Sequence, residues 1–233
     1  MTRPRAILAA GFCLSIAATS LVFSAEEEGF TSLLNGKDLA GWKGNTKYWS
    51  VEDGCVVGRT TEDNLLKYNT FLIWEGDPPA DFELRFSYRI VGGNSGVQYR
   101  SRVTDEDKFV VSGYQGDIDS STQYSGMTYE EKARGFLAER GQKTTIASDG
   151  TKSVEAIGDA AELQKLIHNE DWNDYTIIAQ GNHLRHFING ALMSEVIDNQ
   201  ADAAAKDGVI AIQVHQGPPM TIQVRDMRIR ELK

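Results

Sequence analysis

The stretch from Gly113 to Asp119 carries the side chains in this sequence best suited to chemistry. Its residues alternate, so Gln115, Asp117 and Asp119 share one face of a predicted strand, while Tyr114 points to the other. Two carboxylates spaced by two residues along a strand lie roughly 6.5–7 Å apart, which suits acid–base work on a sugar. An ordinary solvent-facing strand with scattered charge explains the same pattern equally well.

Two more polar rows are predicted elsewhere in the chain. Gln98 and Arg100 share one face of a strand after the turn at residues 93–96, and Gln213 and His215 share a face near the C-terminus. If these strands join one sheet with the first stretch, their polar side chains converge on one floor: Gln98, Arg100, Asp117, Gln213 and His215.

Amide, guanidinium, imidazole and carboxylate groups are what a polyhydroxyl ligand needs, because each sugar hydroxyl both donates and accepts hydrogen bonds. Aromatic rings could stack on the sugar, although packing in the core is the commoner role for such rings. His186 lies on a weaker, mixed face. We predict that a carbohydrate contacts a set of polar and aromatic residues: Asn94, Gln98, Arg100, Tyr114, Gln115, Tyr129, Arg134, His186 and Gln213.

The elements that must position these residues are mostly β-strands, because sequence patterns typical of strands dominate the chain. Apolar and polar residues alternate from Phe82 to Ile90, as in a half-buried strand. Asp53-Gly54 and Asn189-Gly190 mark tight hairpins, and only residues 159–167 carry a helical signal. The patterns predict one all-β domain over residues 30–233, folded as a two-sheet antiparallel sandwich.

The first 25 residues have the pattern of a secretory signal peptide. Arg3 and Arg5 precede an uncharged run over residues 6–22, and small residues at Ser24 and Ala25 precede three glutamates. An uncleaved membrane anchor is the alternative, but the run is short for a spanning helix. We expect cleavage near Ala25 and a periplasmic or secreted mature protein without stable membrane association.

Charge and cysteine content narrow the function classes. Loss of Arg3 and Arg5 would change the formal net charge from −9 to −11, so the mature chain has no electrostatic attraction for nucleic acid. Cys55 would then be the lone cysteine, which predicts a buried packing residue and no disulfide. No nucleotide-binding loop or serine-hydrolase elbow is present. We expect no cofactor; the acidic turn at residues 105–107 offers only an unsupported structural Ca²⁺ site.

The opening segment from Phe30 to Trp42, Phe-Thr-Ser-Leu-Leu-Asn-Gly-Lys-Asp-Leu-Ala-Gly-Trp, resembles the start of the 3-keto-disaccharide hydrolase domain family. The resemblance implies a concanavalin-A-like jelly roll, of the lectin and glucanase type, with a concave sugar-binding face. It also implies hydrolysis of 3-keto-glycosides. Further matching motifs follow in order along the chain: 93–100, 113–117, 172–175, 188–190, 212–215 and 228–232.

The sequence departs from the family at two places. The family pattern Tyr-Glu-x-Gln-Ile-x-Asp has an amide at Gln115 here and a carboxylate at Asp117, so the two groups are exchanged. The segment at residues 129–141 resembles a feature of a subfamily. The fold carries over despite these changes, whereas the catalytic assignment does not.

The 3-keto chemistry suggests roles for the candidate residues. A ketone at C3 acidifies the C2 proton, so a base can remove that proton while the C1 group leaves, and water adds later. We expect Asp117 to be the base and Arg100 or His215 to stabilise the enolate. The acid would be one of three carboxyl groups: Asp119, Glu130 or Glu139.

Other functions remain open at this point. A non-catalytic carbohydrate-binding module would use the same polar floor, and a structural or adhesion domain would need no small ligand. The acidic row also resembles that of β-glucanases on the same fold, but Gln115 cannot be the nucleophile that such an enzyme requires.

Overall fold

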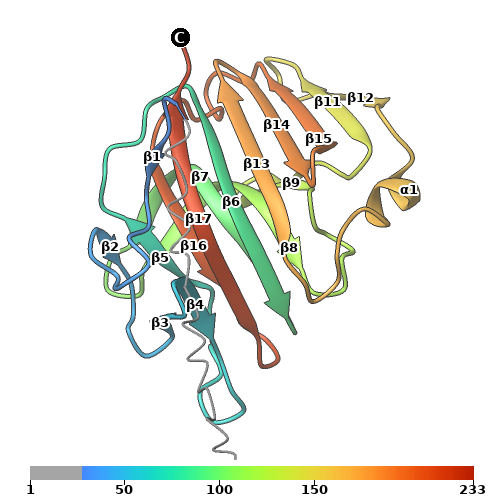
Figure 1. Ribbon diagram of the computed structural model, residues 1–233. Helices are drawn as coiled ribbons and strands as arrows, with labels where there is room; N and C mark the ends of the chain where they lie inside the picture. The colour runs from blue at the N-terminus through green and yellow to red at the C-terminus, as the bar shows by residue number, and fades with distance from the viewer. Residues whose placement is uncertain (1–27) are drawn as a thin grey trace, which may run out of the picture.

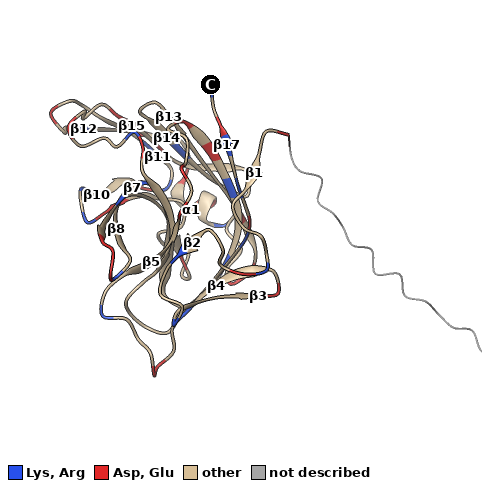
Figure 2. Ribbon diagram, turned by 90° about the vertical axis from the view of Figure 1, so that its left-hand side faces the viewer, with Lys and Arg blue, Asp and Glu red and all other residues tan. Residues whose placement is uncertain are grey.

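The alternating apolar residues close two β-sheets against each other, which confirms the predicted all-β sandwich. The computed structural model describes residues 28–233, so the predicted signal peptide lies outside the described residues. Figure 1 shows the ten-stranded sheet in front of the seven-stranded sheet, and Figure 2 shows the two layers from the side.

The ten-stranded sheet is antiparallel except for one pair at its edge, where β11 and β15 run parallel. A two-residue strand, β1 (Thr31–Ser32), pairs with β17 outside the main path. The remaining strands follow in spatial order: β12 (Lys152–Ala156), β11 (Gln142–Ile146), β15 (Ala191–Asp198), β14 (His183–Ile188), β13 (Asn173–Gln180), β6 (Phe82–Val91), β17 (Thr221–Glu231), β4 (Cys55–Arg59) and β3 (Trp49–Glu52).

The seven-stranded sheet is antiparallel throughout and carries most of the predicted polar rows. Its strands follow in spatial order: β10 (Gly135–Ala138), β9 (Thr128–Glu131), β8 (Val110–Asp119), β7 (Asn94–Asp105), β16 (Val209–Val214), β5 (Thr70–Trp74) and β2 (Trp42–Lys43).

The predicted turns form where the sequence places them. Asp53 and Gly54 both have positive φ, 50° and 79°, between β3 and β4, as the tight hairpin requires. Asn189 and Gly190, between β14 and β15, also have positive φ, of 50° and 80°. The helix is shorter than the 159–167 segment: α1 spans Ala160–Gln164, and the Asp159 side chain caps its first N–H groups.

The space between the sheets is filled by aromatic and aliphatic side chains. Tyr99 and Tyr114 stack with ring centroids 5.6 Å apart, and Phe82 packs edge-on against Tyr99. Cys55 is buried and free, as predicted. Because each of these strands buries one row here, the opposite rows of the seven-stranded sheet point away from the ten-stranded sheet.

The outer face of the seven-stranded sheet is concave, because the β7–β8 hairpin bends back over it. Two register shifts interrupt the β7–β8 pairing, and Arg100 at the first has φ +47°. The bend brings Phe109 O within 2.9 Å of Phe71 N on β5. A second apolar cluster seals this contact on the outer face: Phe71, Ile73, Val111 and Ala211.

Among residues 28–233, the helical segment is too short and too polar to cross a membrane.

Candidate active site

The register of β8 confirms the alternation predicted for residues 113–119. Tyr114 and Ile118 face the core between the sheets, whereas Gln115 and Asp117 face outwards. Gln115 Nε2 donates to Asp117 Oδ1 at 2.5 Å. The side-chain amide of Gln98, opposite Gln115 on β7, bonds to Gln115 at 2.7 Å. The polar row is therefore a connected and buried layer, which distinguishes it from a solvated strand face.

A glycine separates Asp117 from the next polar strand. Asp117 pairs with Gly96 on β7, and the β7–β16 register continues so that Gln213 lies on the far side of Gly96. A Cβ on Gly96 would lie 2.5 Å from the Gln115 side chain, so only glycine leaves room for that amide to lie across β7. Asp117 and Gln213 therefore stand on opposite sides of a depression, roughly two strand spacings or ~10 Å apart at the backbone.

The buried side-chain amide of Gln213 makes no hydrogen bond to the described residues. Its side chain is fully buried and lines the cavity, yet neither Oε1 nor Nε2 has a hydrogen-bond partner among the described residues. An unpaired buried amide costs about 1–3 kcal/mol. A ligand hydroxyl or carbonyl that enters the cavity would satisfy both atoms, so Gln213 marks a place where a polar ligand binds.

Asp117 is the titratable group that the site perturbs most. Only 5% of the residue is exposed, and burial raises the pKa of its carboxyl group to about 8. The hydrogen bond from Gln115 opposes this rise, while the nearby charges of Glu131 and Asp119 add to it. Asp117 therefore carries a proton at neutral pH, which suits a proton donor better than the base that we expected from the sequence.

The cavity has a volume of about 330 Å³ and a mixed lining. His215 stands at the end of β16, and its Nδ1 donates to the carbonyl oxygen of Gln216, which leaves Nε2 for a ligand. Tyr124, Tyr129 and Phe136 form an aromatic wall, in which the Phe136 ring stacks on Tyr124 at 5.7 Å. The lining residues are Asn69, Asn94, Gln115, Asp117, Tyr124, Tyr129, Glu131, Phe136, Gln213 and His215.

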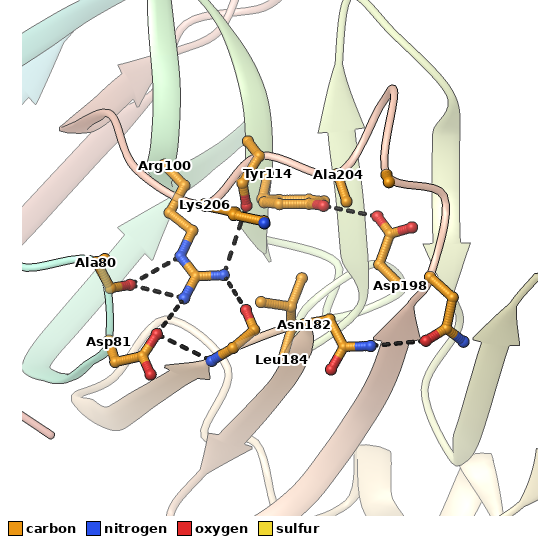
Figure 3. A pocket seen from close by; sticks show the side chains of 13 residues that line it. Ala80, Asp81, Arg100, Tyr114, Asn182, Leu184, Asp198, Ala204 and Lys206 are labelled. Carbon is orange, nitrogen blue, oxygen red and sulfur yellow. Dashed lines mark hydrogen bonds and ion pairs between the residues drawn. The ribbon is translucent and has the colours of Figure 1, made fainter. Parts of the chain in front are cut away.

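Arg100 does not face this cavity, and the expectation that it shares a floor with Asp117 is wrong. The bulge in β7 turns its side chain into a different cavity, of about 440 Å³, between the two sheets (Figure 3). There its guanidinium donates to the carbonyl oxygens of Ala80 and Gly181 and pairs with Asp81. All of its nitrogen atoms have protein partners, so Arg100 serves as a structural anchor.

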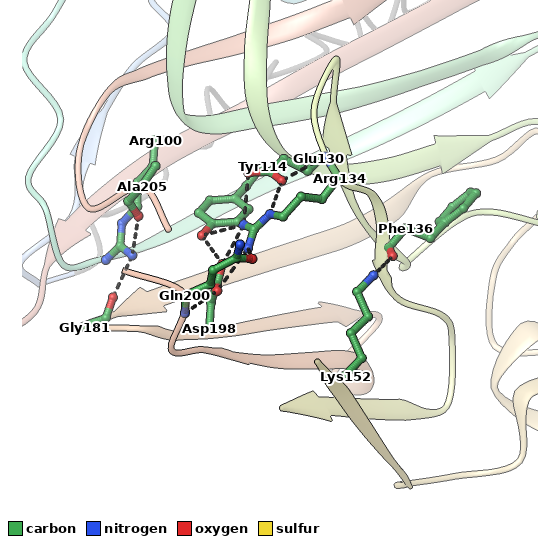
Figure 4. Close-up of polar contacts among 10 residues, drawn as sticks. All are labelled: Arg100, Tyr114, Glu130, Arg134, Phe136, Lys152, Gly181, Asp198, Gln200 and Ala205. Carbon is green, nitrogen blue, oxygen red and sulfur yellow. Dashed lines mark hydrogen bonds and ion pairs between the residues drawn. The ribbon is translucent and has the colours of Figure 1, made fainter. Parts of the chain in front are cut away.

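Tyr114, Glu130 and Arg134 form a separate cluster on the inner face, again away from Asp117 (Figure 4). Arg134 pairs with Glu130 at 2.5 Å and with Asp198 at 2.6 Å. The Tyr114 hydroxyl donates to Asp198 at 2.6 Å, and burial raises the pKa of that hydroxyl well above its usual value. The charges satisfy one another here, so the cluster ties β8 and β9 to β15.

Four other expected site residues lie outside the cavity lining. His186 is fully buried between the sheets, where burial lowers its pKa to about 3 and the Tyr99 hydroxyl meets Nε2 at 2.8 Å. Asp119 accepts hydrogen bonds from the Ser121 hydroxyl and the Gln123 N–H. Glu139 is exposed. Gln98 lies beneath Gln115 and supports it without lining the cavity.

The sequence did not single out Asn69, Glu131 or Phe136. Asn69 Nδ2 donates to Glu131 Oε1 at 3.1 Å, although 62 residues separate them. Only the curvature of the sheet brings this pair together, so no local pattern could reveal it. Alternation within residues 128–131 could have favoured Glu131 over Glu130, because Tyr129 and Glu131 share a face.

No group of three or more His, Cys, Asp or Glu side chains within residues 28–233 is arranged to hold a metal ion. In the acidic turn at residues 105–107, Asp105 instead pairs with Lys108 at 2.7 Å.

Comparison with solved structures shows which proteins share this fold. A candidate glycosyl hydrolase from Parabacteroides distasonis ATCC 8503 matches with a TM-score of 0.57 and 19% identity, over 87% of this chain and 99% of that chain. The carbohydrate-binding module CBM66 from Bacillus subtilis matches with a TM-score of 0.51 and 15% identity, over 87% and 96%. At these identities the likeness concerns the fold alone, and it confirms the jelly-roll type.

Sequence comparison adds the family. A 3-keto-disaccharide hydrolase from Bacteroides thetaiotaomicron is 30% identical over 105 residues, covering 38% of this chain and 33% of that protein. The alignment therefore spans about a third of the relative's length. The model of the 3-keto-alpha-glucoside-1,2-lyase-like domain matches residues 29–230. The chain therefore belongs to the 3-keto-alpha-glucoside-1,2-lyase-like domain family.

Proposed function

We propose that the cavity between Asp117 and Gln213 cleaves glycosides of 3-keto sugars by expelling the group at C1. The family name and the name of the Bacteroides relative both support this substrate class. The observation that carries the proposal is a buried carboxyl group of raised pKa that shares a cavity with an unpaired amide. Perturbed titratable groups in a cavity are typical of catalysis.

The chemistry needs three functions from the protein. A base removes the C2 proton, and the electron pair of that bond forms a C1–C2 double bond while the C1–oxygen bond breaks. An acid protonates the departing oxygen, and donors stabilise negative charge on the C3 oxygen. The products are an unsaturated 3-keto sugar and an alcohol, and addition of water to the double bond then gives the free 3-keto sugar.

The cavity offers groups for two of these functions directly. The proton on Asp117 is available for the leaving oxygen at neutral pH. Gln213 Nε2 is an unpaired donor beside the same depression. Because the side chain of Gln213 is fully buried, a hydrogen bond from it to a developing enolate is stronger than it would be in solvent.

A carbohydrate-binding module is the second candidate. The aromatic wall and the unpaired amide of Gln213 would serve binding alone, since both can contact an unreactive sugar. The raised pKa of Asp117 favours the enzyme, because a binding module gains nothing from burying a carboxyl group that ionises with difficulty.

Incubation of the purified protein with a 3-keto-glucoside and with its unoxidised parent separates the two candidates. The enzyme releases the C1 alcohol from the keto sugar and leaves the parent intact, as product analysis by NMR would show. A binding module would bind one or both sugars in calorimetry and release no alcohol from either.

We also propose export of the mature chain, from the signal-peptide pattern before Glu26. The intact mass of the protein isolated from its host tests this, and a mass that includes Met1 to Ala25 would contradict it.

A further inference from the structure

Glu131 is the second carboxyl group of the cavity, whereas its neighbour Glu130 was the residue expected from the sequence. Strand β9 presents Tyr129 and Glu131 to the concave face, whereas Glu130 turns inwards to Arg134. Glu131 is 8% exposed, so its side chain is held at the site and not in bulk solvent. Of the two charges that disfavour ionisation of Asp117, that of Glu131 has the larger effect.

One oxygen of Glu131 is fixed and the other is open. Asn69 Nδ2 donates to Oε1 at 3.1 Å, and Asn69 is itself held because its Oδ1 accepts from the N–H of Gln216. Among the described residues, Oε2 accepts no hydrogen bond. A carboxylate oriented by one oxygen, with the other directed to a cavity, has the geometry of a general base.

We propose that Glu131 is the base that removes the C2 proton, while Asp117 is the acid that protonates the leaving oxygen. This assignment rests on the function proposed above. The C2–H electron pair forms the C1–C2 double bond, the C1–O pair leaves with the alcohol oxygen, the C2 proton passes to Glu131, and the Asp117 proton passes to the alcohol. The two carboxyl groups thus exchange protonation states, and solvent restores both before the next turnover.

The division of roles has a simple electrostatic reason. Asp117 shares a cavity of about 330 Å³ with Glu131, whose negative charge adds to the effect of burial in opposing ionisation of Asp117. Asp117 accepts a hydrogen bond from the uncharged amide of Gln115, and Glu131 accepts one from Asn69. Burial therefore leaves the proton on Asp117.

The other carboxyl groups do not suit the role of base. Both Asp119 contacts are with its own loop, and Glu130 is paired with Arg134 on the inner face. Glu139 is exposed and lies outside the cavity lining. His215 lines the cavity and is the remaining candidate, which the experiment must separate from Glu131.

Proton removal can be measured without C–O cleavage. The 3-ketone of 1,5-anhydroglucitol keeps the C2 proton but has no group at C1 to expel, so deuterium uptake at C2 in D₂O, followed by NMR, reports the base alone. We expect Glu131→Gln to slow this uptake by about 10²-fold or more, because the amide cannot accept the proton. Asp117→Asn should change it less than about threefold, since the acid takes no part in this step.

Cleavage of two 3-keto-glucosides reports the acid. Asp117→Asn should lose far more activity on a methyl glycoside than on a nitrophenyl glycoside, because the nitrophenolate leaving group needs no proton. Glu131→Gln should lose activity on the two glycosides about equally. Glu139→Gln makes the same change at an exposed carboxylate outside the cavity and is the matched control, expected to behave as the wild type.

These measurements distinguish a wrong choice of base from a wrong function. Wild-type protein that cleaves keto-glycosides, together with a Glu131→Gln variant that exchanges C2 as fast as the wild type, would overturn the assignment and leave the function standing. Loss of exchange on His215→Ala but not on Glu131→Gln would move the base to His215. Wild-type protein that neither exchanges nor cleaves would remove the function itself.

If Glu131→Gln does not fold, C2 exchange by His215→Ala still tests His215 as the base, and the pH dependence of the wild type tests Asp117. With Asp117 as the acid, cleavage of the methyl glycoside falls as pH rises through about 8, while C2 exchange does not fall. Exchange that instead rises through pH 8 would assign the base to Asp117 and overturn the proposal.

Discussion

The burial of Asp117 has opposite consequences for chemistry and for stability. Burial raises the pKa of this carboxyl group to about 8, which keeps a proton available at neutral pH. The unfolded chain releases the same proton near pH 4. Between these values the folded state holds a proton that the unfolded state has lost, so the free energy of unfolding falls as pH rises from about 4 to about 8.

Asp117→Asn should therefore stabilise the protein, and increasingly so at higher pH. The amide never ionises, so it avoids a cost of up to about 1.4 kcal/mol per pH unit over this window. Thermal unfolding of both proteins at pH 5, 7 and 9 measures the difference. A melting-temperature gain that shrinks as pH rises would show that Asp117 is not held protonated by the fold.

At the scale of the strand, alternation predicted correctly which way β8 faces. Gln115 and Asp117 line the cavity and Tyr114 packs between the sheets, as a period of two requires. Tyr114 was also predicted to contact the ligand, but its register places it between the sheets. For Arg100, alternation gives the wrong face, because the β7 bulge reverses the side chain and a bulge has no fixed sequence signal.

The anchoring role of Arg100 predicts a loss of stability without a loss of chemistry. Arg100→Met should lower the free energy of unfolding by about 2–4 kcal/mol, because the carbonyl oxygens of Ala80 and Gly181 lose a buried charged donor. Denaturant unfolding measures this loss. At a temperature where the variant is folded, kcat on a 3-keto-glucoside should match the wild type, and a specific loss of kcat would restore Arg100 to the site.

At the scale of the whole molecule, the sandwich was predictable because strand patterns and turn pairs are local. The cavity was only partly predictable from the sequence. The sequence identified Asp117, Gln213 and His215, which lie in two polar rows that the sheet brings together. It could not identify the contact between Asn69 and Glu131, which depends on the bending of the β7–β8 hairpin over its own sheet. That curvature arises from packing of the second apolar cluster, and no short segment encodes it.

The central claim is that this concave cavity is catalytic, and comparing turnover with binding for Asp117→Asn tests it most directly. On a methyl 3-keto-glucoside at pH 7, we expect turnover to fall by about two to four orders of magnitude, because the proton donor is lost. Affinity measured by calorimetry should change much less, since the amide can still meet a hydroxyl. An Asn variant that turns over the keto-glucoside as fast as the wild type would contradict the account.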